Sequence, residues 1–243
     1  MALVFDVSAD LALFRKPYTT TSMISYPFPP PTAVAGIIGA IVGIPNGSDD
    51  DAKNALFWNH LSGTRIAVGI NKPVEWMVTA VNLLKYKTAN ADMKEHIQIK
   101  HQFVKKPSYR LYVSEGEVYK SLKERLKNGE FVFTPYLGVA YALADINYIG
   151  EYEEEGVEEE FIEVSTVVPQ YQVEIDVLKS GGVYRETVPY RLSTTRSMEE
   201  SVRVFYPVFT HHLTEKPELI IKERGQLLIT KVGAEKVAWF NAW

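Results

Sequence analysis

The chain has 243 residues, of which 46% are hydrophobic and 23% are charged, and these proportions are typical of a soluble globular protein. This length is enough for one large domain or two small ones. The chain has no cysteine, which excludes structural disulfides and thiolate metal sites. Its formal net charge is −4, which would disfavour a polyanionic partner only if the charges were evenly spread.

The charges are in fact segregated along the chain. Eight acids and no base occur between residues 151 and 163: Glu151, Glu153, Glu154, Glu155, Glu158, Glu159, Glu160 and Glu163. Without these eight, 22 acids remain against 26 bases. Residues 85–110 contain seven Lys or Arg against two acids, together with His96 and His101. A basic patch of this kind can attract an anionic backbone despite the acidic total.

The first predicted element is a strand over residues 2–8 (ALVFDVS), followed by a long connection over residues 9–31. The N-terminal residues lack the basic and long apolar regions of a signal peptide. The longest apolar run, residues 33–44, is shorter than the roughly 20 residues that span a bilayer. We therefore expect a cytoplasmic protein that does not enter a membrane.

A helix is predicted over residues 32–43, because prolines precede it and Gly43 and Pro45 follow its apolar residues. It has glycines at positions 36, 39 and 43. The Lys-Ser/Thr ending of a phosphate-binding loop is absent, and the spacing differs from that of a dinucleotide fingerprint. We interpret these glycines as packing residues that let the helix lie close to a sheet.

The next predicted elements are a short helix (51–61), strands at 64–70 and 74–84 joined by a turn, an amphipathic helix (117–126), and strands at 131–133 and 141–148. Apart from the short helix, the order is β-α-β-β-α-β, with a long insertion between the third strand and the second main helix. This α+β order is ferredoxin-like, and RNA-recognition modules use it to present an open sheet to single-stranded RNA.

The second half of the chain is predicted to be rich in short strands. Residues 151–160 resemble an exposed loop or hairpin tip, and strand-like runs follow from residue 161 onward. We expect a ferredoxin-like RNA-binding domain at residues 1–150, with its basic insertion at 85–110, and a mostly antiparallel β subdomain at 151–243 packed closely against it.

Signatures of catalysis and metal binding are few. The sequence has no G-x-S-x-G nucleophile elbow, and His211-His212 has no partner at a zinc-binding spacing. The glutamate run lacks the Asp/Asn/Gly pattern of a calcium loop. We expect neither a metal nor another cofactor.

Residues 97–112 combine cations with aromatic side chains. Cations bind phosphates with release of counterions, and aromatic faces stack on unpaired bases. An amphipathic hairpin with a lysine-rich outer face would have the same composition, so this alternative stays open. A weaker basic-aromatic cluster consists of Tyr184-Arg185, Tyr190-Arg191, Arg196 and Arg203, and Arg15, Lys16 and Tyr18 lie in the connection after the first strand.

Several short motifs together resemble the CRISPR-associated "Cas five" family, a branch of a repeat-associated RNA-binding superfamily built on ferredoxin-like domains. The resemblance covers about the first 150 residues, whereas the second half matches only in length and strand-rich character. The matching motifs are Phe14-Arg15, Ser25-Tyr26-Pro27, Pro30-Pro31-Thr32 leading into Gly36-Ile37-Ile38-Gly39-Ala40, Gln102-Phe103, Tyr109-Arg110-Leu111-Tyr112 and Thr134-Pro135-Tyr136-Leu137-Gly138.

The resemblance implies a subunit of a type I Cascade surveillance complex in antiviral defence. Such a subunit caps the 5′ handle of the CRISPR RNA, contacts the large subunit and the terminal backbone subunit, and meets target DNA only through the complex. A β-hairpin "thumb" would lie between residues 84 and 109. The candidate RNA-binding residues are Arg15, Lys16, Tyr18, Ser25, Tyr26, Lys100, His101, Lys105, Lys106 and Arg110.

Two other functions are compatible with the sequence. One branch of the family cuts precursor RNA without a metal, and Tyr26, Lys100 and His101 could supply its general base and its phosphate-stabilising cation. The other alternative hypothesis is a scaffold that binds only protein partners. Our preferred expectation is a non-catalytic RNA-binding protein.

Overall fold

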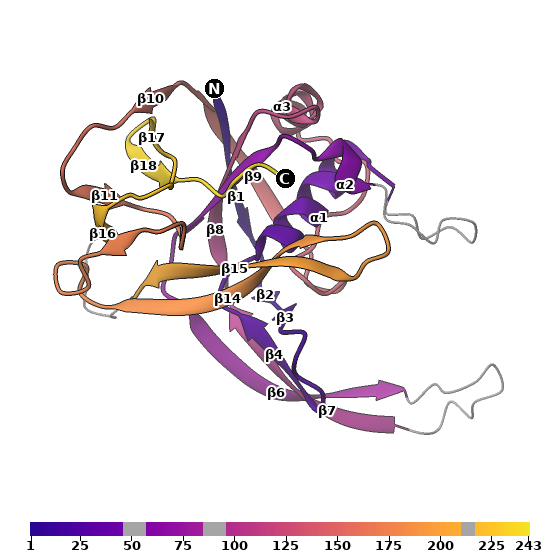
Figure 1. The fold of residues 1–243 in the computed structure, drawn as a ribbon. Coiled ribbons are helices and arrows are strands. Elements are labelled where there is room, and N and C mark those ends of the chain that lie inside the picture. Colours follow the sequence, from indigo (N-terminus) through magenta and orange to yellow (C-terminus); the bar gives the residue numbers. More distant parts are fainter. Residues whose placement is uncertain (46–56, 85–95, 210–216) are drawn as a thin grey trace.

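The computed structural model describes residues 1–45, 57–84, 96–209 and 217–243 and consists mostly of β-strands (Figure 1). The helices are α1 (Pro31–Val42), α2 (Phe57–His60) and α3 (Tyr119–Asn128). The strands of the N-terminal half are β1 (Ala2–Ser8), β2 (Leu11–Ala12), β3 (Phe14–Arg15), β4 (Ser22–Tyr26), β5 (Arg65–Ile70), β6 (Glu75–Leu84), β7 (His96–Lys105), β8 (Ser108–Ser114) and β9 (Asp145–Tyr152). Those of the C-terminal half are β10 (Glu154–Gly156), β11 (Ile162–Val164), β12 (Val168–Pro169), β13 (Glu174–Ile175), β14 (Val183–Leu192), β15 (Met198–Pro207), β16 (Leu219–Glu223), β17 (Ile229–Val232) and β18 (Glu235–Ala238).

A four-stranded sheet with the order β5-β8-β1-β9 lies at the centre of the molecule. Every neighbouring pair in it is antiparallel. Helix α1 connects β1 to β5, and α3 connects β8 to β9. Because side chains alternate along a strand, Leu3, Phe5 and Val7 of β1 all point into the main core.

The two main helices cover that face of the sheet. Ile38 and Ile41 of α1 and Leu122 and Leu126 of α3 are buried in the same core as β1. Helix α1 starts at Pro31, where the missing N–H costs no helical hydrogen bond. It ends at Gly43, whose φ of 85° is left-handed and whose N–H donates to the Gly39 carbonyl oxygen.

The opposite face of the central sheet is covered by the C-terminal half. Ala2, Val4 and Tyr112 on this face pack against Val237 and Trp239. The Trp239 side chain is only 1% exposed. Both faces of the central sheet are therefore covered, in contrast to the open sheet of RNA-recognition modules.

The C-terminal half forms three small sheets with the orders β10-β17-β18, β11-β16-β13 and β12-β15-β14. The β14–β15 hairpin runs across α1 (Figure 1). Its inner-face residues Val188, Tyr190, Val202 and Val204 belong to the same core as the central sheet. The two halves of the chain thus share one hydrophobic core.

Strands β6 and β7 form a long hairpin that projects away from the central sheet (Figure 1). We call residues 75–84 and 96–105 the arm. β4 pairs in parallel with the other edge of β7. The sequence predicts that the insertion follows the third strand of the central sheet. In the structure the arm instead lies between β5 and β8, which are the second and third strands of that sheet in chain order, and β6 pairs with β7 rather than with β5. Lys85, Lys87 and Lys94 lie outside the described residues.

Several predicted element boundaries also differ from the structure. The connection at 9–31 contains three short strands, residues 131–133 form no strand, and β9 begins later than the predicted 141–148. Helix α3 (Tyr119–Asn128) begins and ends two residues later than the predicted helix at 117–126. Of the short helix predicted at 51–61, only residues 57–60 are helical within the described part.

The packing role predicted for two of the glycines in α1 is wrong. A Cβ added at Gly36 or Gly39 would find no atom within 4 Å outside the local helix. Gly43 does require glycine, because its φ is left-handed and a Cβ there would lie 2.7 Å from Val132.

The acidic stretch is also more structured than expected. Glu151 belongs to β9 and pairs with Lys123 at 2.5 Å, and Glu154 of β10 pairs with Arg65 at 3.4 Å. These contacts tie the start of the acidic stretch to α3 and β5 instead of leaving it as a solvated tip.

Candidate RNA-binding surface

The two faces of the arm present different chemistry, because successive side chains of a strand point to opposite sides. Lys100 of β7 is exposed and is paired with Ala80 of β6 and Ser22 of β4. His101 points to the other face, next to Thr79 and Met23. The adjacent Lys100 and His101 therefore cannot converge on one phosphate.

His101 is a buried structural side chain with 1% exposure. Its Nδ1 lies 2.9 Å from the Ile99 carbonyl oxygen, so Nδ1 carries the proton, because a carbonyl oxygen can only accept. The imidazole stacks on the Phe103 ring at 5.5 Å, and Tyr141 packs edge-on against Phe103. This environment leaves no access for a ribose hydroxyl.

Ser25 and Tyr26 of β4 are also buried, at 1% and 2% exposure. The Ser25 hydroxyl accepts a hydrogen bond from the Phe14 N–H at 2.8 Å and donates to the Tyr26 carbonyl oxygen at 2.7 Å. Burial, together with the nearby Tyr18 and Glu186, raises the pKa of Tyr26 to about 12. Tyr26 is therefore neutral at physiological pH, and both residues support the base of the arm rather than contacting RNA.

Lys16 connects the base of the arm to the C-terminal half. Its Nζ forms an ion pair with Glu186 of β14. The same ammonium lies 5.2 Å from the centroid of the Tyr26 ring and 6.0 Å from that of Tyr18. The Lys16 side chain is only 15% exposed, so its charge is largely used within the protein.

The most accessible candidates are Arg15, Tyr18, Lys100, Lys105 and Lys106. The Arg15 guanidinium donates to the Thr19 carbonyl oxygen at 2.9 Å, and the Tyr18 side chain is 67% exposed. Lys105 pairs with Glu75 across the arm at 3.7 Å, with both side chains about half exposed. An ion pair this exposed is weak and would exchange readily for a phosphate.

Arg110 lies outside this surface. Its guanidinium contacts Asp6 at 2.8 and 3.0 Å and Glu235 at 2.9 Å. The hydrogen bond to Asp6 raises the pKa of Arg110 above its already high ordinary value. Arg110 thus anchors the C-terminal half to the central sheet, and its charge is already satisfied by two carboxylates.

Sequence reasoning missed Trp76 of the arm, which is 43% exposed. Strand β6 has apolar residues on both of its faces, a pattern that predicts a strand buried on both sides. In the structure most of its side chains are exposed instead. Tyr184 was noted only as part of a weak cluster. Its ring is 51% exposed and lies on β14, two residues from Glu186.

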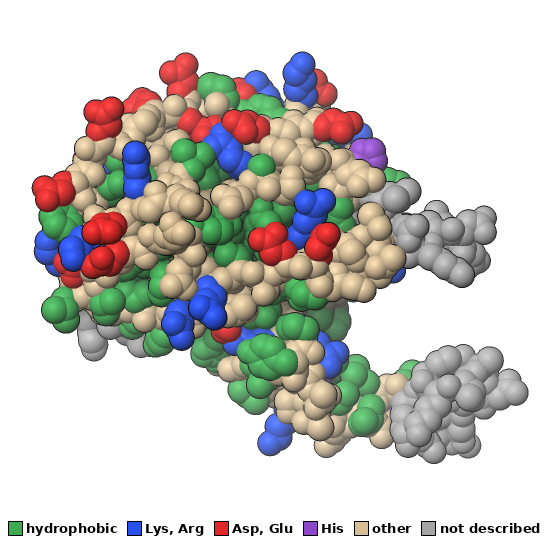
Figure 2. Space-filling view, in the orientation of Figure 1, with side chains coloured by type: hydrophobic (Ala, Val, Ile, Leu, Met, Phe, Trp, Pro, Cys, Tyr) green, Lys and Arg blue, Asp and Glu red, His purple; other side chains and the backbone are tan. Residues whose placement is uncertain are grey.

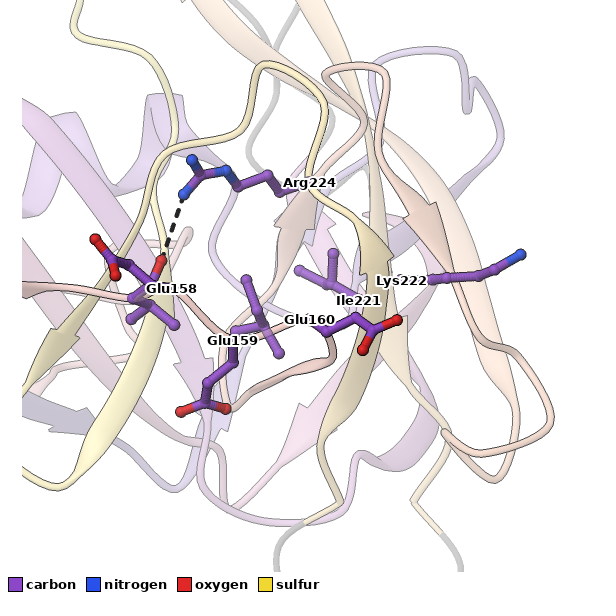
Figure 3. Close-up of a pocket in the computed structure, with 8 residues that line it drawn as sticks. Glu158, Glu159, Glu160, Ile221, Lys222 and Arg224 are labelled. Carbon is purple, nitrogen blue, oxygen red and sulfur yellow. Dashed lines mark hydrogen bonds between the residues drawn. The ribbon is translucent and has the colours of Figure 1, made fainter.

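Acidic side chains gather away from the arm, toward β10, β11 and the C-terminal strands (Figure 2). A pocket of about 340 Å³ lies in that region, lined by Val157, Glu158, Glu159, Glu160, Ile162, Ile221, Lys222 and Arg224 (Figure 3). Arg224 turns toward the Val157 carbonyl oxygen, at 3.4 Å. The three carboxylates make this pocket a poor site for a polyanion.

Neither a membrane-spanning helix nor a metal cluster is found in the described parts of the chain. None of the helices there is long and apolar enough to cross a membrane. No three His, Asp or Glu side chains gather as a metal site would require. His211 and His212, which have no partner at a zinc-binding spacing in the sequence, lie outside the described residues.

The sequence matches the model of one protein family over residues 2–206. The family is described as CRISPR-associated protein (Cas_Cas5). No curated protein matches the chain in sequence.

Similar folds occur in several solved structures. A chain of a CRISPR RNA-guided surveillance complex matches with a TM-score of 0.56 and 12% identity, over 86% of this chain and 90% of that one. A CRISPR protein from Archaeoglobus fulgidus matches with a TM-score of 0.53 and 16% identity, over 98% and 97%. A chain of the type III-B Cmr-beta complex bound to cognate target RNA and AMPPnP matches with a TM-score of 0.52 and 10% identity, over 90% and 86%. At these identities the matches show a shared fold.

Proposed function

The chain belongs to the family of CRISPR-associated proteins described as Cas_Cas5, and we propose that it is a non-catalytic RNA-binding subunit of a type I CRISPR surveillance complex. In this proposal it caps the 5′ handle of the guide RNA and joins the large and backbone subunits. Similar folds in a CRISPR RNA-guided surveillance complex and in the type III-B Cmr-beta complex support an assembly role.

The observation that carries the proposal is the set of exposed cations on the arm and on β3 next to it. Lys100 and Arg15 are both accessible, on opposite faces of the strands they share with β4, and acids gather elsewhere on the molecule. The central sheet cannot serve instead, because both of its faces are covered. Single-stranded RNA held by cations and read through its unpaired bases suits such an exposed surface.

We further infer that residues 1–150 form a ferredoxin-like domain and that residues 151–243 form a second, mostly antiparallel β unit docked on it. The strand order β5-β8-β1-β9 with two crossover helices supports this assignment. The arm would be the part that reaches a neighbouring subunit, because Trp76, Val78 and Ile97 expose apolar surface on both of its faces.

The endoribonuclease alternative gains no support from the geometry. General-base catalysis needs a group within hydrogen-bond reach of the reacting hydroxyl. His101 is buried, and Lys100 points to the opposite face of β7. The Tyr26 phenol is buried as well.

The test is a fluorescence-anisotropy titration of the purified protein with labelled single-stranded RNA from its own CRISPR repeat. We expect binding that weakens with salt, and an intact RNA after incubation. Lys100→Ala should weaken binding, whereas Lys231→Ala, which removes a lysine paired with Glu155, should not. Absence of binding would exclude the RNA-binding role, and a cleavage product would exclude the non-catalytic one.

A further inference from the structure

We propose that Tyr18 and Tyr184 form a stacking site for unpaired RNA bases where the base of the arm meets the C-terminal hairpin. This inference rests on the proposed RNA-binding function and adds the residues that would hold bases. It assigns to β14 a direct part in RNA binding.

The two tyrosines are exposed, and one ion pair links the segments that bear them. Tyr18 is 67% and Tyr184 is 51% exposed. Lys16 lies under the Tyr18 ring and pairs with Glu186, which shares a face of β14 with Tyr184. The pair thus holds the loop after β3 against β14.

Tyr184 is braced from behind by other rings. Its centroid lies 5.3 Å from that of Tyr206, and Tyr206 packs edge-on against Phe28 at 5.3 Å. Phe28 is fully buried in the main core. A ring held from behind and open on its other side loses little conformational freedom when a base stacks on it.

The surrounding charges favour RNA over an apolar protein segment. Arg185 and Arg203 are exposed on the β14–β15 hairpin, on the face opposite Tyr184, and Arg15 is exposed on β3, just before the loop that bears Tyr18. Basic side chains are visible where β14 passes the base of the arm (Figure 2). Glu186, which shares a face of β14 with Tyr184, is neutralised by Lys16.

The site is also continuous with the face of the arm that bears Lys100. Lys100 is paired with Ser22 of β4, and Ile24 and Tyr26 follow on the same face of that strand. Tyr26 lies next to Lys16. A strand of RNA could therefore contact Lys100 through a phosphate and continue toward Tyr18 and Tyr184 with its bases.

The experiment uses the full-length protein and short single-stranded repeat RNAs with 2-aminopurine at successive positions, because stacking quenches its fluorescence. We compare Tyr184→Leu, which keeps apolar packing on Tyr206 but removes the ring, with Tyr184→Phe, which keeps the ring. Tyr152→Ala removes an exposed tyrosine from the acidic side of the molecule as the control. Circular dichroism confirms the fold of each variant.

We expect quenching at defined positions in the wild type, loss of quenching at one of them in Tyr184→Leu, and its retention in Tyr184→Phe. Tyr18→Ala should abolish quenching at a neighbouring position. Tyr184→Leu should bind RNA about tenfold more weakly, with the same dependence on salt, because stacking releases no counterions.

Two outcomes would count against the inference in different ways. If the wild type binds RNA and Tyr184→Leu matches it in affinity and quenching, the stacking site is wrong while the proposed function stands. If the wild type retains no RNA, the proposed function itself fails.

Discussion

Neighbouring residues of the arm have unlike roles because a strand separates them by face. Lys100 is solvent-exposed, whereas His101 is buried against Phe103. The same principle separates exposed Arg15 from Lys16, which is held by Glu186. At the scale of single residues, exposure rather than residue type therefore distinguishes the binding candidates from the structural ones.

Substitutions at Lys100 and His101 should separate binding from stability. Lys100→Ala should reduce the slope of log affinity against log salt by about 0.7, as expected for one lost phosphate contact on single-stranded RNA. His101→Ala should cost about 1–3 kcal/mol of unfolding free energy and leave that slope unchanged. Anisotropy titrations at several salt concentrations and urea denaturation measure the two effects. Unchanged stability in His101→Ala would contradict its buried role.

Glu151 should make stability depend on pH at the junction of α3 and β9. Hydrogen bonds from Lys123 and Tyr119 hold the pKa of Glu151 below its ordinary 4.5. A lowered folded-state pKa adds stability that is present above about 4.5 and is lost as the pH falls below it.

The test compares wild type with Glu151→Gln in urea denaturation across this pH range. We expect the variant to be less stable at neutral pH and the difference to shrink under acidic conditions. Glu153→Gln on the adjacent acidic stretch is the matched control. A stability difference that does not change with pH would overturn the assignment.

Among the elements, α1 illustrates how the ends of a helix constrain its sequence more than its middle does. The prolines before it and Gly43 after it each satisfy a backbone requirement. Gly36 and Gly39 lie inside the helix, where neither a left-handed φ nor a close neighbour requires glycine. Their effect on stability should therefore be that of glycine in a helix interior.

Gly36→Ala should stabilise the protein by up to about 1 kcal/mol, because alanine loses less backbone entropy on folding than glycine does. Gly43→Ala is the contrasting variant and should destabilise it, because its left-handed φ disfavours a Cβ that would also approach Val132. The midpoints of urea unfolding measure both changes. Destabilisation by Gly36→Ala would indicate a close contact at that face of the helix.

At the scale of the whole molecule, the C-terminal half decides which surfaces remain free. It closes the second face of the central sheet through Val237 and Trp239. The Arg110–Asp6–Glu235 contacts reinforce this closure. Since the β14–β15 hairpin also joins the main core, both halves should unfold in a single transition.

Trp239→Ala tests this closure. The Trp239 indole N–H donates to the Thr230 hydroxyl at 2.7 Å, and its ring lies against Arg65 and Tyr112. Removal should cost about 3–5 kcal/mol, whereas Trp76→Ala on the exposed arm should cost less than about 1 kcal/mol. Far-UV circular dichroism and tryptophan fluorescence, followed together in urea, should give coincident transitions. Separate transitions would show that the halves fold independently.

Local patterns in the sequence determined the first strand, the extent of α1, the α+β fold class and the family, because each depends on neighbouring residues or on short motifs. The position of the insertion, the closed sheet and the burial of His101 depended on tertiary structure. Strand pairing is settled between residues far apart in the chain, as in β1 with β8. Burial in turn depends on which distant side chains cover a face of a strand. The local sequence around Tyr112 or Tyr26 does not show whether a distant segment will cover that side chain.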